Sequence, residues 1–476
     1  MVVVEASKLT LPNPSSLSSP HTTSILFEPS SLSLALTHSD SSLSLYPSFS
    51  QSQSQSQSLA QPHTLIPSPS SSSTFLLLQS PSNPNSTPNV LFLVSSPHRA
   101  GSQILLRFFI LHRHTNSFAA LPRVLCSHKD LRFEPKLGVL LDSKHGVSVK
   151  LAGSVNYFAL YSVSSSKVWV FAVKTDNDDD GWCLKLMRCA AIECSRPVWS
   201  VSVSFGFLLL GEENGVRVFG LRRLVKGRGG KRVGGSRQVR NGGGGRGERG
   251  GKCSGGEGVA EVVNFNGDLE GRIEKHGVAG RIWVRYKVLS FVLSQDFLDV
   301  KQTNVKFKYD NRYGGSCFVA LKRNEVETKS TMKVSISIKA ISIQAVSQKM
   351  FLILDSHGDL HLLCLSNSGI GFDIAGSMRQ LPHVMKVQGL AVLPDVSTIS
   401  QTIWISDGCH SVHMFTAMDM ENALNEADGN DCGEKLIRLP AIRVLFSSEK
   451  ILDISSLASN SVLILGQGSL YAYAIS

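Results

Sequence analysis

The sequence predicts an all-β protein in which one short hairpin unit is repeated along the chain. Apolar runs of a few residues alternate with Gly, Asn, Asp and Ser, a pattern typical of strands joined by turns. The clearest example spans 198–221, where Asn214-Gly215 precedes the last apolar run. This dipeptide supplies the positive-φ positions that a two-residue hairpin turn needs. The second observation is that the same pattern recurs over most of the chain, which favours a repeat architecture.

Composition allows a large core and confines the basic charge to one segment. The chain has 476 residues, of which 42% are hydrophobic and 18% charged, with a formal net charge of +11. Between Arg222 and Lys252 there are eleven lysines and arginines and a single acid, Glu248. The rest of the chain is therefore close to neutral, which excludes an argument for nucleic-acid binding over the whole surface.

Cysteine usage and the N-terminus bear on the compartment. The nine cysteines are odd in number and none forms a Cys-x-x-Cys pair, which favours free thiols in a reducing compartment over disulfides or a zinc site. No apolar run is long enough to suggest a membrane span. The N-terminus lacks the charge and apolar core of a secretory signal. We expect the nucleus, the cytoplasm or both; the alternative is an organelle, because the Ser/Thr-rich, acid-poor start faintly resembles a transit peptide.

Seven repeated units follow one another along the chain. The spacing predicts further strand patterning at 317–321 and 334–346, candidate strands without register at 281–291 and 305–309, and a short helix over 417–427. The predicted units are 25–46, 75–111, 133–173, 183–221, 350–365, 387–415 and 451–475.

Two segments have compositions that do not support a packed core. Residues 50–73 are rich in Ser, Gln and Pro and are predicted to form a loop. Residues 222–258 are rich in Gly and Arg and are predicted to be a disordered insertion.

Seven units spaced at roughly forty residues predict a single seven-bladed β-propeller of four-stranded antiparallel sheets over 1–476. An open ring would leave two sheet edges exposed, which proteins avoid. We therefore expect the N-terminal strand at 2–6 to close the last blade, 451–475. The alternative is a pair of β-sandwiches or another all-β repeat.

The hairpin pattern resembles the WD40-like β-propeller superfamily. The resemblance rests on an apolar run, a Gly or Asp turn and an alternating apolar run, as at 166–170, 209–219 and 403–408. The chain has no Trp-Asp dipeptide and no Gly-His before the units, so the Asp-His-Ser/Thr-Trp hydrogen-bond network of WD repeats is expected to be absent or replaced. The resemblance implies a non-catalytic scaffold for protein–protein interactions in a multiprotein complex.

The Gly/Arg segment supports an alternative function as an RNA-associated nuclear or nucleolar factor. Arginine next to glycine can contact phosphates and stack on bases while the backbone stays adaptable. The competing interpretation is a solvated insertion without a role. The candidate RNA-contacting or nuclear-import residues are Lys226, Arg228, Lys231, Arg232, Arg237, Arg240, Arg246 and Arg249.

Motifs for catalysis or metal binding are weak. Gly-x-Ser-x-Gly and the Walker loop are absent from the sequence, and the glycines near 227–251 lack the strand-to-helix context of a dinucleotide site. The run Asp176–Asp180 lacks the spacing of a calcium loop. We therefore predict no enzyme activity, catalytic residue, metal, cofactor or small-molecule substrate, and other proteins as partners. Histidine pairs without further ligands are His112/His114, His357/His361 and His410/His413, and the tryptophans expected in packing are Trp169, Trp199, Trp283 and Trp404.

Overall fold

The computed structural model describes most of the repeated units. All described residues belong to one compact unit formed by 1–228 and 286–476. They are residues 4–11, 20–49, 59, 62–80, 86–143, 146–178, 181–226, 303–304, 316–321, 337–367, 374–381, 385–393, 402–417 and 443–475.

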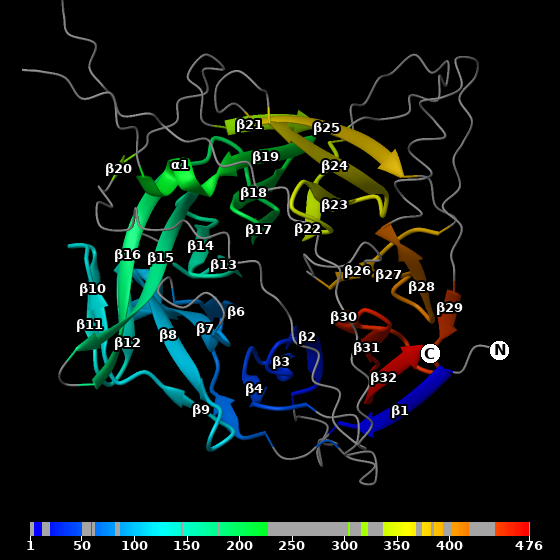
Figure 1. Ribbon diagram of the computed structural model, residues 1–476, viewed down its shortest axis with the longest axis horizontal. Coiled ribbons are helices and arrows are strands. Elements are labelled where there is room, and N and C mark those ends of the chain that lie inside the picture. The colour runs from blue at the N-terminus through cyan, green and yellow to red at the C-terminus, as the bar shows by residue number, and fades with distance from the viewer. Residues whose placement is uncertain are drawn as a thin grey trace, which may run out of the picture. The chain divides into compact units, whose positions relative to one another are not determined.

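Seven β-sheets are arranged as blades around a ring (Figure 1). The innermost strand of each blade contacts the innermost strand of the next blade, and that of blade seven contacts that of blade one. These innermost strands are β2 (Thr22–Glu28), β6 (Ser72–Leu78), β13 (Val149–Gly153), β17 (Ser200–Ser204), β22 (Ala340–Ala345), β26 (Gly389–Val392) and β30 (Asp453–Ala458). The ring is therefore closed. This architecture confirms the predicted seven-bladed propeller and excludes the β-sandwich alternative.

Blade one contains a strand that the sequence analysis assigned to a loop. Residues 64–66 form its outer strand, although 50–73 was predicted to be loop throughout. The strand forms because Ile66 is buried against the neighbouring blade while Leu65 stays exposed, so one buried side chain offsets the polar composition. The strands of blade one are β2 (Thr22–Glu28), β3 (Ser33–His38), β4 (Leu43–Tyr46) and β5 (Thr64–Ile66).

Blades two and three each carry six strands, which departs from the predicted four. Residues 133–142, predicted in the third unit, extend blade two, and 183–187, predicted in the fourth unit, belong to the fourth strand of blade three. An apolar run shows that a strand exists but does not specify the edge with which it pairs. Blade two comprises β6 (Ser72–Leu78), β7 (Asn89–His98), β8 (Gln103–His112), β9 (Ser117–Ala120), β11 (Leu131–Glu134) and β12 (Gly138–Asp142), with the 3₁₀ turn η2 (Arg99–Gly101); blade three comprises β10 (Val124–Cys126), β13 (Val149–Gly153), β14 (Tyr157–Ser162), β15 (Lys167–Asp178), β16 (Gly181–Glu193) and β20 (Thr303–Asn304).

Blades four, five and six are four-stranded meanders. In blade four, helix α1 (Leu221–Lys226) follows the third strand. Its strands are β17 (Ser200–Ser204), β18 (Phe207–Glu212), β19 (Gly215–Gly220) and β21 (Ser316–Ala320); blade five has β22 (Ala340–Ala345), β23 (Met350–Asp355), β24 (Leu360–Asn367) and β25 (Ile374–Leu381); blade six has β26 (Gly389–Val392), β27 (Thr402–Ser406), β28 (Ser411–Thr416) and β29 (Arg443–Phe446).

The Asn214-Gly215 turn of blade four matches the prediction at its first residue only. Asn214 has φ 60°, but Gly215 already belongs to β19 and is not in the left-handed region. Glycine is needed there for space, because a Cβ would lie 2.6 Å from the carbonyl oxygen of Val319 and 2.4 Å from the Phe318 ring. The predicted helix at 417–427 and the candidate strands at 281–291 and 305–309 lie outside the described residues, apart from Ala417.

Blade seven is built from both ends of the chain. β30 (Asp453–Ala458), β31 (Ser461–Leu465) and β32 (Ser469–Ile475) form the meander. β1 (Val4–Thr10) pairs antiparallel with β32 from Val4↔Ile475 to Thr10↔Ser469 (Figure 1). The N-terminal strand thus extends four residues beyond the predicted end at residue 6.

The core consists of seven apolar clusters, one between each pair of neighbouring blades. Successive side chains of a strand enter different clusters: Tyr157 and Ala159 of β14 face blade four, whereas Phe158 and Leu160 face blade two. Because a middle strand is buried on both faces, its sequence is a continuous apolar run instead of an alternating one.

Candidate functional site

One end of the ring, which we call the turn face, is held by the same backbone bond in every blade. The turn face comprises the turns between the second and third strands and the connectors that lead to the next blade. In each blade a connector N–H donates to a carbonyl of that blade's turn. The seven bonds are Ser70 to Ser41, Ser143 to Ser102, Cys194 to Ser166, Leu321 to Asn214, Val387 to Gly358, Ser447 to His410 and Leu11 to Gly468, at 2.8–3.2 Å.

A buried carboxylate organises the turn of blade five. Oδ1 of Asp355 accepts hydrogen bonds from the backbone N–H groups of His357 (2.8 Å) and Asp359 (2.9 Å). Oδ2 lies 2.9 Å from Nε2 of His361, and both side chains are 2% exposed. An ionised carboxylate only accepts, so the imidazole donates. This pair provides a local counterpart of the Asp–His contact that the sequence was expected to lack or replace.

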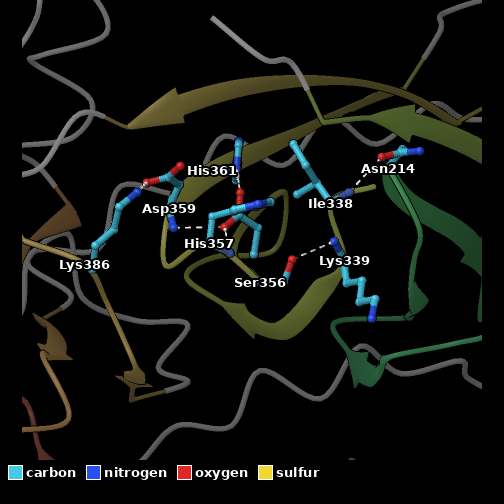
Figure 2. Close-up of polar contacts among 9 residues, drawn as sticks. Asn214, Ile338, Lys339, Ser356, His357, Asp359, His361 and Lys386 are labelled. Atoms are coloured by element: carbon cyan, nitrogen blue, oxygen red, sulfur yellow. Dashed lines mark hydrogen bonds and ion pairs between the residues drawn. The ribbon is translucent and has the colours of Figure 1, made fainter. Parts of the chain in front are cut away.

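Hydrogen bonds continue from this turn to blades four and six (Figure 2). Oδ1 of Asn214 in the blade-four turn accepts the N–H of Ile338 at 3.0 Å. Oγ of Ser356 accepts the N–H of Lys339 at 3.1 Å, and the ammonium of Lys386 lies 2.5 Å from Asp359. Three successive blades are therefore connected through their turns.

Blades six and seven use carboxylates in the same way. Oδ1 of Asp407 accepts the N–H groups of Cys409, His410 and Ser411 at 2.8–3.0 Å. Glu449, on the connector between the two blades, accepts hydrogen bonds from a set of donors around the blade-seven turn. These donors are the N–H of Gly468 (2.9 Å), the hydroxyls of Ser469 and Tyr471 (both 2.8 Å) and the ammonium of Lys8 on β1 (3.3 Å).

The pKa values of these carboxyls show that the hydrogen bonds outweigh burial. Burial raises the pKa of Asp355 and of Asp407, but the amide and side-chain donors lower each below its ordinary value. For Glu449 the same balance lowers the pKa to about 2. All three groups are therefore charged at neutral pH and accept hydrogen bonds from the backbone of their turns.

Two lysines and a tryptophan lie at the same face on blades three to five. The ammonium of Lys150 donates to the carbonyl oxygen of Trp199. The ammonium of Lys339 lies 4.0 Å from the centroid of the Trp199 ring, a distance at which the ring attracts a cation.

The structure describes little of the Gly/Arg segment. Lys226 is the last residue of α1. The other predicted RNA-contacting or import residues, Arg228, Lys231, Arg232, Arg237, Arg240, Arg246 and Arg249, lie outside the described residues, so the structure does not bring them together with any site.

Two histidines of the three pairs contact a carboxylate or a backbone carbonyl. His361 pairs with Asp355, and Nδ1 of His410 lies 3.2 Å from the carbonyl of Ser447. The described part of the chain contains no group of three or more His, Cys, Asp or Glu arranged to hold a metal ion. Seven cysteines are described, and none of them forms a disulfide.

Two of the four tryptophans that were expected in packing lie in the core: Trp169 is 6% and Trp404 0% exposed. Trp199 is partly exposed, and Trp283 lies outside the described residues. In the same described ranges, no helix has the length and apolar character needed to cross a membrane.

Sequence reasoning did not find Asp355, Glu449 or the Lys150–Trp199–Lys339 cluster. Asp355 carried a local signal, since an aspartate at a Gly turn was followed six residues later by a histidine. Glu449 and the cluster carried none, because their partners are distant in the sequence and are brought together only by ring closure.

Seven meander blades around a closed ring define a β-propeller, a fold whose blades are typically four-stranded sheets. The chain has the fold of a seven-bladed β-propeller. No family model matches the propeller's sequence, and no curated protein sequence matches it either.

Three solved structures that are similar to this propeller are each 8% identical to it in sequence. The structure of U3-55K covers 98% of each chain with a TM-score of 0.44. The RRP9 WD40 repeats cover 100% of each chain with a TM-score of 0.41. The Cps50 (Swd1) β-propeller domain of Myceliophteria thermophila covers 97% of this chain and 100% of that one, with a TM-score of 0.42. At this identity the likeness concerns the fold alone.

Proposed function

We propose that the propeller is a non-catalytic scaffold that binds other proteins in a multiprotein complex through its turn face. The observation that carries the proposal is the backbone bond repeated at all seven turns. Carboxylates reinforce this bond in blades five to seven. Loops held on a rigid framework are where proteins commonly place binding residues, and a fold becomes functional through such surfaces.

The test compares two pairs of charge changes in the full-length protein expressed in cells. Arg99→Glu with His357→Glu alters exposed residues of two turns on the turn face. Lys349→Glu with His114→Glu makes the matched changes at exposed positions on the opposite face. We expect proteins that co-purify with the unaltered chain to be lost with the first pair and retained with the second. Equal loss with both pairs, or with neither, would contradict the proposal.

RNA contact through 222–258 and a nuclear location remain predictions from the sequence. The segment follows β19, the third strand of blade four, so the chain leaves the blade at the end opposite the turn face. Ribonuclease treatment of the purified complexes separates the two functions: partners lost after treatment, and lost on deletion of 227–258, support the RNA alternative. A fluorescent fusion of the full chain tests the compartment.

A further inference from the structure

Three side chains meet where the inner strands of blades three, four and five begin. Lys150 is the second residue of β13, Trp199 directly precedes β17, and Lys339 directly precedes β22. These inner strands contact one another in turn, so the three residues lie at the same end of the ring, on the turn face. We call them the Lys150–Lys339 patch.

The position of the tryptophan is set by its backbone. The N–H of Trp199 donates to the carbonyl of Gly211 at 2.7 Å. Its carbonyl accepts from Lys150, and its ring lies below the Lys339 ammonium. Figure 2 shows the side chain of Lys339 extending away from Ser356, which bonds only its backbone. Two cations from different blades thus converge on one residue.

Neither cation has a carboxylate partner among the described residues, whereas three other lysines of the ring do. Lys386 pairs with Asp359 at 2.5 Å, Lys167 with Glu193 at 3.5 Å and Lys8 with Glu449 at 3.3 Å. Half-burial lowers the pKa of Lys150, and no neighbouring acid offsets this desolvation. An incoming anion would supply the missing charge.

We propose that the Lys150–Lys339 patch binds a carboxylate side chain of an acidic segment in a partner protein. The inference rests on the proposed scaffold function and specifies the chemistry of one partner. One carboxylate would accept charge-assisted hydrogen bonds from both ammonium groups. Complementary charge of this kind gives specificity and speeds association.

A short acidic peptide fits the surroundings better than a nucleic acid. Glu213 lies beside the patch, because its backbone forms an antiparallel bridge with Lys339. Asp359 lies on the turn of blade five, and Glu193 is the last residue of β16 in blade three. A nucleic acid carries a continuous row of phosphates and requires several cations. It would meet these carboxylates, whereas one or two acidic side chains need only the patch.

The experiment measures fluorescence anisotropy of a labelled peptide of alternating Glu and Gly titrated with the full-length protein. The matched control probe has Gln in place of each Glu. We expect the acidic peptide to bind and the control peptide not to bind. Lys339→Gln should weaken binding about tenfold, and Lys150→Gln by a similar factor. Lys349→Gln removes the same charge from an exposed position on the opposite face and should change binding by less than about twofold.

Three outcomes would overturn the inference: equal binding of both peptides, equal loss with Lys339→Gln and Lys349→Gln, or tighter binding of single-stranded oligouridylate that the same two patch variants abolish. If Lys150→Gln lowers the melting temperature, Lys339→Gln alone tests whether the patch binds the acidic peptide, because the Lys339 ammonium lies outside the core. The peptide could fail to bind while the binding of partner proteins still depends on Arg99 and His357. This result would reject the patch but would still support the scaffold function.

Discussion

Blade five and blade seven contain carboxylates in different surroundings. Blade five is one continuous segment, and its Asp355 receives a histidine N–H and two turn amides within the blade. Blade seven is assembled from both chain ends. Among the described residues, the donors to its Asp453 are two backbone amides, those of Ile25 in blade one and of Ile454, both at 2.9 Å.

The opposite pKa shifts follow from these donor sets. The pKa of Asp355 is lowered, because its donors outweigh burial, whereas burial raises the pKa of Asp453 to about 6. The comparison shows what a buried carboxylate needs in order to remain ionised. Two backbone amides do not offset the cost of burial, whereas two amides together with a histidine N–H do. Four predictions test this contrast.

The largest effect should come from removing β1. Deletion of residues 1–8 would leave 471–475 of β32 with an unpaired edge and would remove most of the strand that holds Leu9 in the cluster between blades seven and one. We expect the free energy of unfolding to fall by at least about 3 kcal/mol, measured by urea denaturation. Adding a peptide of residues 1–11 should restore part of the loss. Unchanged stability would mean that the ring does not depend on this strand.

Asp355→Ala should have the next largest effect. The change leaves the His361 ring and two turn amides without their acceptor, and we expect a loss of about 3 kcal/mol. Asp355→Asn keeps an oxygen for the turn amides and should lose less. The measurement is thermal unfolding followed by circular dichroism. Equal losses for the two variants would show that the acceptor for the turn amides contributes little.

Asp453→Asn should change how stability depends on pH. Because the folded pKa of about 6 lies above the ordinary value of 3.8, the folded state binds the proton more tightly. The contribution of Asp453 is therefore fully present below about pH 4 and is lost as the pH rises through about 6. Unfolding free energies at a series of pH values should fall by ~2 kcal/mol less over this window in the variant. Parallel curves for both proteins would contradict the assignment.

Glu449→Gln should have the smallest effect, about 1 kcal/mol. The pKa of Glu449 is lowered from 4.5 to about 2, so its contribution is present above about pH 4.5 and is lost as the pH falls through about 2. Hydrogen exchange should show faster opening of β1, which Glu449 contacts through Lys8. Glu193→Gln, in an exposed pair with Lys167, is the control and should leave exchange unchanged.

Much of the fold could be predicted from the sequence because each blade contains its own signals. Asp and Gly predict the turns at Ser356–Asp359 and Asp407–His410. The apolar runs on either side of each turn predict the middle strands of the blade. Predictions failed where pairing is not local. The strand at Thr64–Ile66 has one buried apolar residue, and 133–142 and 183–187 were assigned to the wrong blades.

The candidate site was largely unpredictable for the same reason. Asp355 and His361 are six residues apart and leave a local trace. Lys150 and Lys339 belong to blades three and five, and no sequence pattern relates them.

By itself, the sequence determined the succession of strands and turns, the number of blades and the single basic segment. These features depend on local residue preferences and on the number of repeated units. Only the tertiary structure decided which edge each outer strand joins, how β1 completes blade seven, and which charged groups meet across blades. Strand pairing and charge balance depend on which surfaces become neighbours when the ring closes, and that is a property of the assembled blades as a whole.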